Sequence, residues 1–124
     1  MKRPVPASGL GHLRVTLDED AYIGPGRADL LELIDKTGSI SAAGKAMGMS
    51  YKRAWGLVQA LNAGFGAPLV ETARGGAAQG GAELTALGHK VLAHYRTMQD
   101  KTAAAIAGDV AALRALKSNI SQKK

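Results

Sequence analysis

Cysteine is absent from the 124 residues, which excludes disulfide scaffolds, thiol nucleophiles and zinc or iron–sulfur sites with cysteine ligands. Aromatic residues make up only 4%, and no apolar run approaches the roughly 20 residues that span a bilayer. The basic start, MKRPVPASGLGH, is not followed by the apolar core of a secretory signal. These absences predict a chain that works in the cytoplasm, without a membrane.

Acidic residues are also in short supply. Sixteen Lys and Arg stand against ten Asp and Glu, which gives a net charge of +6. The excess lies late in the chain, since residues 86 to 124 hold seven basic and only two acidic groups. A small domain this basic favours an anionic partner, either nucleic acid or a membrane surface. The apolar share of 46% predicts one hydrophobic core at this length.

The motifs of enzymes and metal sites are missing as well. His89 and His94 are five residues apart, about 140° around a helix, so they share no face. There is no HExxH, no phosphate-binding P-loop and no G-x-S-x-G. The acidic run at residues 18–20 lacks the spaced oxygen ligands of a calcium loop. We therefore expect no catalytic residue, no metal site and no cofactor.

Hydrophobic spacing, serine caps and glycine stops predict the helical part of the fold. The alternation of Leu13, Val15 and Leu17 predicts a half-buried strand over residues 12–17. Apolar faces between capping residues predict three helices, at residues 28–38, 42–48 and 51–66.

The second half of the chain begins with a predicted hairpin. Short strands at residues 69–72 and 82–84 flank the glycine-rich sequence RGGAAQGG, which is typical of a β-hairpin. We expect the strand at 12–17 to join it as a third strand. Thr85 caps a long helix, in which Gly108 favours a break because glycine costs roughly 1 kcal/mol in a helix interior.

These elements predict a mainly α protein with a small antiparallel β-sheet, namely a winged helix-turn-helix with a long C-terminal dimerisation helix. The expected organisation is a flexible tail at 1–11, the winged helix-turn-helix at 12–107 and a helical extension at 108–124. Apolar and small residues recur at threes and fours along the last helix and predict a homodimer seam: Leu87, Val91, His94, Met98, Thr102, Ala105, Leu113 and Leu116. The alternative is that Leu87, Val91 and Tyr95 close the core of a monomer.

The helix at 51–66 has two different faces at 100° per residue. The predicted core face holds Ala54, Val58, Leu61 and Phe65. The opposite face is centred on Lys52, Gly56, Gln59 and Ala63, with Arg53 and Trp55 on its flanks. A helix that enters the major groove of DNA needs a cation, an amide that reaches base edges and a close backbone approach. The helix N-terminus, with Ser50 and Tyr51, can also donate to phosphate.

Each of these residues also has an ordinary structural explanation. Lys52 and Arg53 could form a solvated face, and Trp55 could be a half-buried anchor. Gly56 could serve only close helix packing. The glycine-rich loop could have no partner, since Arg74 is its only charge.

The sequence GSISAAGKAMGMSYKRAWGLVQALN, residues 38–62, resembles the helix-turn-helix of LysR-type regulators. SYKRAW, the glycine-rich wing after LVET and LTALGHKVLAHY are similar to the ModE family of molybdate-responsive repressors, over residues 13 to about 107. The resemblance implies a dimeric winged helix that binds a palindromic operator in double-stranded DNA and represses molybdate-uptake genes. It places Ser50, Tyr51, Lys52 and Trp55 in the recognition helix, and Arg74, Gly75 and Gly76 in the wing.

ModE proteins carry C-terminal β-barrels that bind molybdate, whereas a short segment of helical pattern follows Ile106 here. We therefore expect no direct molybdate binding. The residues expected to contact DNA are Ser39, Ser41, Ser50, Tyr51, Lys52, Arg53, Trp55, Gly56, Gln59, Arg74, Gly75 and Gly76. The alternative function is a winged-helix protein-interaction adaptor without a specific DNA target, which would present exposed apolar or acidic residues on the outward helix face.

Overall fold

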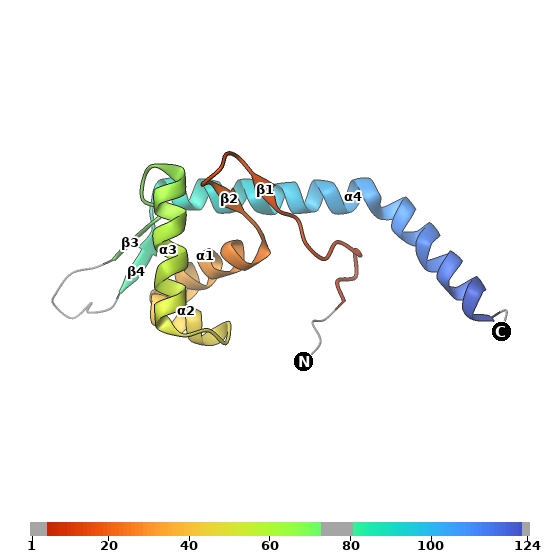
Figure 1. Ribbon diagram of the computed structural model, residues 1–124, viewed down its shortest axis with the longest axis horizontal. Coiled ribbons are helices and arrows are strands. Elements are labelled where there is room, and N and C mark those ends of the chain that lie inside the picture. The colour runs from red at the N-terminus through yellow and green to blue at the C-terminus, as the bar shows by residue number, and fades with distance from the viewer. Residues whose placement is uncertain (1–4, 73–80, 123–124) are drawn as a thin grey trace. The chain divides into compact units, whose positions relative to one another are not determined.

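The computed structural model describes residues 5–72 and 81–122 (Figure 1). The elements are β1 (Val15–Thr16), β2 (Tyr22–Ile23), α1 (Pro25–Thr37), α2 (Ile40–Ala46), α3 (Tyr51–Phe65), β3 (Val70–Thr72), β4 (Ala82–Leu84) and α4 (Ala86–Gln122). They form two compact units, which we call the head unit (Arg14–Tyr95) and the C-terminal unit (Met1–Leu13 with Arg96–Lys124). The predicted fold class, mainly helical with small antiparallel strands and a long last helix, is confirmed.

Helix α1 supplies much of the core of the head unit. It begins at Pro25, where the fixed φ of proline suits the first turn. It ends at Gly38, whose φ of 72° is a left-handed conformation that favours glycine. The predicted apolar stripe is buried at Leu30, Leu31 and Ile34.

Helices α2 and α3 form a helix-turn-helix, and each begins at a serine. The Oγ of Ser39 accepts a hydrogen bond from the backbone N–H of Ala42 at 3.0 Å. In the same way, the Oγ of Ser50 accepts from the N–H of Arg53 at 3.1 Å. A side-chain acceptor of this kind satisfies one of the unpaired N–H groups of a helix start. The cap predicted at Ser50 is confirmed, whereas α2 begins at Ile40, two residues before the predicted start, and is capped by Ser39.

The predicted hairpin is present as β3 and β4, which pair antiparallel with Val70 opposite Leu84 and Thr72 opposite Ala82. The loop end of β4 is tied to the helix-turn-helix, because the N–H of Ala82 donates to the carbonyl of Gly38 at 2.8 Å. The glycine-rich tip predicted between the two strands lies at residues 73–80, outside the described residues.

The strand predicted at 12–17 has a different partner from the one we expected. β1 pairs with β2, with Val15 opposite Ile23, and not with the β3–β4 hairpin. The reason is a tight turn, in which Oδ1 of Asp18 accepts from the N–H groups of Asp20 at 2.9 Å and Ala21 at 3.0 Å. This turn brings the chain straight back on itself, and closing so short a loop costs little entropy.

Helix α4 begins after Thr85, whose Oγ1 accepts from the N–H of Gly88 at 3.0 Å. It runs from Ala86 to Gln122 without interruption, so the break expected at Gly108 is wrong. Alanine is the best helix former, and the Ala-rich sequence around Gly108 outweighs the cost of one glycine. In the C-terminal unit, Nη1 of Arg114 donates to the carbonyl of Ala7 at 3.2 Å. No helix in the described part of the chain has the length and apolar character needed to cross a bilayer.

Candidate nucleic-acid interface

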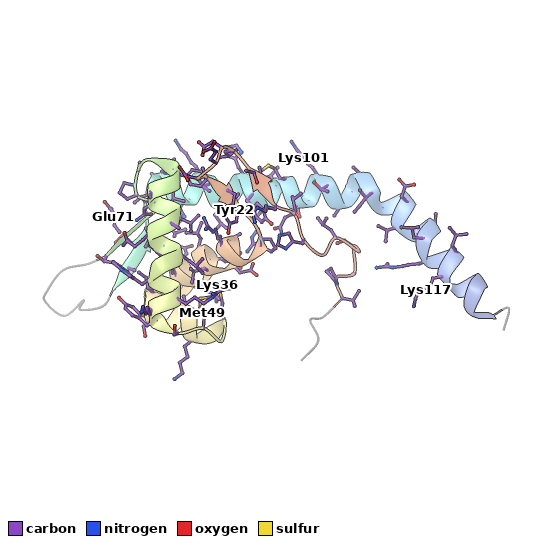
Figure 2. All side chains as sticks on the ribbon, viewed as in Figure 1. Tyr22, Lys36, Met49, Glu71, Lys101 and Lys117 are labelled. Atoms are coloured by element: carbon purple, nitrogen blue, oxygen red, sulfur yellow. The ribbon has the colours of Figure 1, made fainter. Side chains whose placement is uncertain are left out.

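Helix α3 has a buried inner face and an exposed outer face, as its sequence pattern predicted. Ala54, Val58 and Leu61 are buried, whereas Phe65, the fourth residue of the predicted core face, is only half-buried. The outer face, which we define by the exposed residues of α3 opposite them, is polar or small except at its aromatic residues. It comprises Tyr51, Lys52, Arg53, Trp55, Gly56, Gln59 and Ala63. The turn that precedes α3 contains Met49 (Figure 2).

Two aromatic rings lie side by side on the outer face. Tyr51 and Trp55 are one helical turn apart, with ring centroids 6.4 Å apart and ring planes inclined by 17°. Tyr51 is 55% exposed and Trp55 is 37% exposed, whereas the core residue Val58 is only 1% exposed. The rings therefore form an exposed stacked pair, and Trp55 is not part of the buried core of the head unit.

Gly56 follows Trp55 on the outer face and faces open space. Apart from its two chain neighbours and the backbone of α3 itself, no described heavy atom would lie within 4 Å of a Cβ atom built at Gly56. Gly44 of α2 is the contrasting case, since its Cβ would lie 2.9 Å from the Cβ of Ala54. Gly44 is thus the glycine that close packing of α2 on α3 requires, and packing among the described residues does not explain Gly56.

Trp55 borders two hollows of the head unit. The first, of about 640 Å³, lies between the start of α2, the start of α3 and the loop end of the hairpin strands, and we call it the hydroxyl groove. Its described lining residues carry no charge: Gly38, Ser39, Ile40, Ser41, Tyr51, Trp55, Thr72 and Gly81. The second, of about 560 Å³, lies between α3 and the hairpin strands, and its lining includes Gln59, Glu71 and Glu83. We call it the acidic groove.

Glu71 and Glu83 stand directly opposite each other in the hairpin. Both residues are exposed, and Figure 2 labels Glu71 on β3. Like charges opposite each other on one face of a sheet are destabilising. The hairpin is therefore stabilised by other contacts, which join it to the helices.

Asn62 is one residue that makes such contacts. Its Oδ1 accepts from the N–H of Leu69 at 2.8 Å and of Val70 at 3.3 Å, and its Nδ2 donates to the carbonyl of Val70 at 3.3 Å. These bonds fix the hairpin against α3. Asn62 was not among the predicted site residues, although an asparagine is an unfavourable choice in a helix interior and so indicates a local hydrogen-bonding role.

The described residues contain no group of three or more His, Cys, Asp and Glu side chains that could hold a metal ion. The arrangement is instead a rigid helix face with cations, an amide and two aromatic rings, next to an uncharged groove lined with hydroxyl groups. Such a face can accept hydrogen bonds, donate them and pack against flat apolar groups.

The comparison with protein families agrees with this architecture. The family model for "Bacterial regulatory helix-turn-helix protein, lysR family" matches residues 27–89, from the start of α1 to the start of α4. The chain belongs to the lysR family.

Curated relatives of this lysR-family chain are molybdenum-related proteins, which confirms the resemblance to the ModE family. The molybdenum-pterin-binding protein MopB of Rhodobacter capsulatus is 49% identical over 64% of the chain and 29% of its own length. The transcriptional regulator ModE of Yersinia pestis is 36% identical over 89% of the chain and 43% of its own length. For the molybdenum transport protein ModE of Azotobacter vinelandii the values are 32%, 89% and 46%. The chain thus spans less than half the length of these relatives.

Solved structures of lysR-family proteins share the fold. A complex of the CbnR DNA-binding domain with DNA matches 73% of this chain and 95% of its own, with a TM-score of 0.55 and 28% identity. CbnR itself, a LysR family transcriptional regulator, matches with a TM-score of 0.52 and 28% identity over 69% of this chain and 27% of its own.

The structure of the lysR-family head unit brings many of the predicted site residues together. Nine of the twelve are described, and five of these line the two grooves: Ser39, Ser41, Tyr51, Trp55 and Gln59. Ser50, Lys52, Arg53 and Gly56 belong to α3 or its cap but not to the groove linings. Arg74, Gly75 and Gly76 lie outside the described residues.

Proposed function

We propose that this chain is a sequence-specific DNA-binding transcriptional regulator whose α3 enters the major groove of double-stranded DNA. The observation that carries the proposal is the outer face of α3, where Lys52 and Gln59 flank a glycine with open space in front of it. The major groove admits an α-helix, and a close approach brings cation and amide groups to base edges and phosphates. The proposal includes a cytoplasmic location and no catalytic activity.

The proposed contacts divide into two kinds. Gln59, Trp55 and the backbone at Gly56 face base edges, whereas the serine hydroxyls and the cations Lys52 and Arg53 serve phosphates or guanine. Capping uses an acceptor lone pair of Ser39 and Ser50, and the same hydroxyl can donate its proton to a phosphate oxygen.

We also propose that the chain acts as a homodimer, which represses transcription from a palindromic operator. One small helix-turn-helix makes few base contacts, and two-fold symmetry doubles them. Exposed apolar residues on α4 support this: Leu113 is 65% exposed and Leu116 is 57% exposed. Replacing both by Glu should convert a dimer into a monomer in sedimentation equilibrium and weaken operator binding. The helical signal of the monomer should persist, and an unchanged mass near 12.8 kDa before and after substitution would reject the dimer.

The ModE and Mop relatives suggest molybdenum homeostasis as the regulated process. For these 124 residues we propose no direct molybdate binding, because they align with only 29% to 46% of the relatives named above. Calorimetry with molybdate should give no stoichiometric heat. A micromolar site would contradict the proposal.

The decisive test is selection of duplexes from a random library by the full chain, followed by a salt series on the selected sequence. Each phosphate neutralised should contribute about −0.9 to the slope of log K against log salt. Lys52→Ala combined with Arg53→Ala should weaken binding and flatten the slope. Lys101→Ala is a control that also removes an exposed cation, and it should leave specific binding nearly unchanged.

A protein-interaction adaptor is the second candidate, because Tyr51 and Trp55 expose apolar surface on the same face of α3. The selection experiment separates the two functions. An adaptor would enrich no sequence, and its weak binding to any duplex would depend only on net charge. Loss of enrichment in the Lys52 and Arg53 double variant, with the control intact, would favour the regulator.

A further inference from the structure

We propose that the stacked pair of Tyr51 and Trp55 contacts the 5-methyl group of a thymine in the major groove, so that Trp55 determines specificity at one A·T pair in each half-site. This inference rests on the proposed function and deepens it. Trp55 would make the contact, and Tyr51 would be a positioning residue.

The first step is the exposure of the ring. Ala54, Val58 and Leu61 on the inner face of α3 are buried almost completely, yet Trp55 remains 37% exposed on the flank of the helix. It borders both the hydroxyl groove and the acidic groove. The indole ring is therefore an exposed apolar surface that borders both the hydroxyl groove and the acidic groove.

The second step is rigidity. Trp55 is stacked on Tyr51, and Tyr51 is the first residue of a helix whose start is capped by Ser50. An aromatic side chain has only two rotatable bonds, and stacking restricts them further, so little conformational entropy is lost on binding. A ring held in this way before DNA arrives can discriminate between surfaces of similar shape.

The third step is access. The next residue, Gly56, has no side chain, and apart from its chain neighbours and the backbone of α3 no described atom lies within 4 Å of its missing Cβ. The backbone of α3 can therefore come close to the floor of the groove beside Trp55, which brings the indole ring within reach of base edges. A larger residue at position 56 would hold the ring away.

The fourth step is chemistry. The edges of bases in the major groove present hydrogen-bond donors and acceptors, and the thymine 5-methyl is the one apolar group among them. Packing an apolar ring against cytosine would instead desolvate its amino group, which is costly without a hydrogen-bond partner. The stacked pair of Tyr51 and Trp55 therefore favours thymine. A duplex with 5-methylcytosine at the same position should bind more tightly than one with cytosine.

The test replaces each thymine of the selected duplex, one at a time, by uracil, which removes only the methyl group. One position in each half-site should then lose affinity by about fourfold, as expected for one methyl-sized apolar contact. Trp55→Ala should weaken binding and abolish the difference between thymine and uracil at that position alone. Trp55→Phe should retain part of the difference, and Tyr51→Phe should retain most of it.

Trp55 is the single tryptophan of the chain, so its fluorescence emission reports this site directly. Emission should change on binding the thymine duplex and change less with uracil at the sensitive position. Thermal unfolding of each variant checks that the fold is intact.

Two results would overturn the inference while leaving DNA binding in place. One is a wild-type chain for which no thymine-to-uracil change matters, and the other is a Trp55→Ala chain that keeps the same methyl sensitivity. A wild-type chain that enriches no duplex would overturn the proposed function as well.

Discussion

The inner and outer faces of α3 have almost opposite composition, although they alternate along the same 15 residues. The inner face is small and aliphatic, and it packs against α1 and α2. The outer face holds two cations, an amide, two aromatic rings and a glycine with open space in front of it. Stability should therefore depend on the first face and recognition on the second.

The two glycines of the helix-turn-helix extend the comparison. Gly44 has no room for a Cβ because Ala54 of the inner face lies against it, whereas Gly56 has room to spare. A glycine in a helix costs about 1 kcal/mol relative to alanine. At Gly44 the glycine permits close packing of α2 on α3, which offsets this cost. At Gly56 no contact among the described residues offsets it.

The largest expected effect is at the centre of the inner face. Leu61 is fully buried, and Leu61→Ala should lower the free energy of unfolding by about 2–5 kcal/mol, because it removes transfer energy and leaves a cavity. Urea denaturation followed by circular dichroism measures the change. Ala63→Ser on the exposed side is the matched control and should stay within about 0.5 kcal/mol. Equal effects of the two variants would remove the distinction between the faces.

Gly44→Ala comes next. The added methyl would lie 2.9 Å from the Cβ of Ala54, so α2 and α3 must move apart, and overpacking of this kind costs roughly 1–3 kcal/mol. The gain in helix propensity offsets only part of that. Ala54→Gly in the same chain should recover stability relative to the sum of the two single changes, and simple additivity would contradict the contact.

The cap of α3 should have an intermediate effect. Ser50→Ala removes the hydroxyl that accepts from the N–H of Arg53, and the unfolding free energy should fall by about 1 kcal/mol. Ser50→Asp keeps the cap and should restore stability, but it places a negative charge where phosphate would bind. If Ser50→Asp restored stability and also bound DNA as well as the wild-type chain, the start of α3 would not contact a phosphate.

Gly56→Ala should have the smallest effect on stability and the opposite sign. Because its Cβ meets nothing, the variant should be more stable by up to about 1 kcal/mol. Binding of the selected duplex should nevertheless weaken by about tenfold, since one extra methyl in a close-packed contact costs roughly 1–3 kcal/mol. Thermal unfolding and a binding titration on the same sample give both quantities. A more stable chain with undiminished affinity would exclude close backbone approach at Gly56.

The sequence was sufficient to predict the elements whose signals are local. Serine caps at Ser39 and Ser50, the glycine stop at Gly38 and the three-and-four spacing of α3 led to the helices and to the division of α3 into two faces. The predicted strand partner of β1 was wrong, because strand propensity indicates that a segment is extended but not which segment it pairs with.

Contacts between distant segments were beyond the sequence for the same reason. Asn62 looks like an ordinary polar residue of a helix until Leu69 and Val70 are known to lie beside it. The pairing of Glu71 with Glu83 depends on the register of the hairpin. The different roles of Gly44 and Gly56 likewise depend on which helices touch, and nothing in their immediate neighbours separates them.

The unequal charge of the two grooves has a consequence for the path of a bound duplex. A strand of phosphates is tolerated over the hydroxyl groove, which has no charged residue in its described lining, and is repelled from the groove that holds Glu71 and Glu83. Trp55 borders both grooves. A duplex bound along α3 would therefore place its phosphates over the hydroxyl groove and not over the acidic groove. In the proposed complex, Glu71 and Glu83 would therefore contribute no attraction of their own and would still determine the orientation of the duplex on α3.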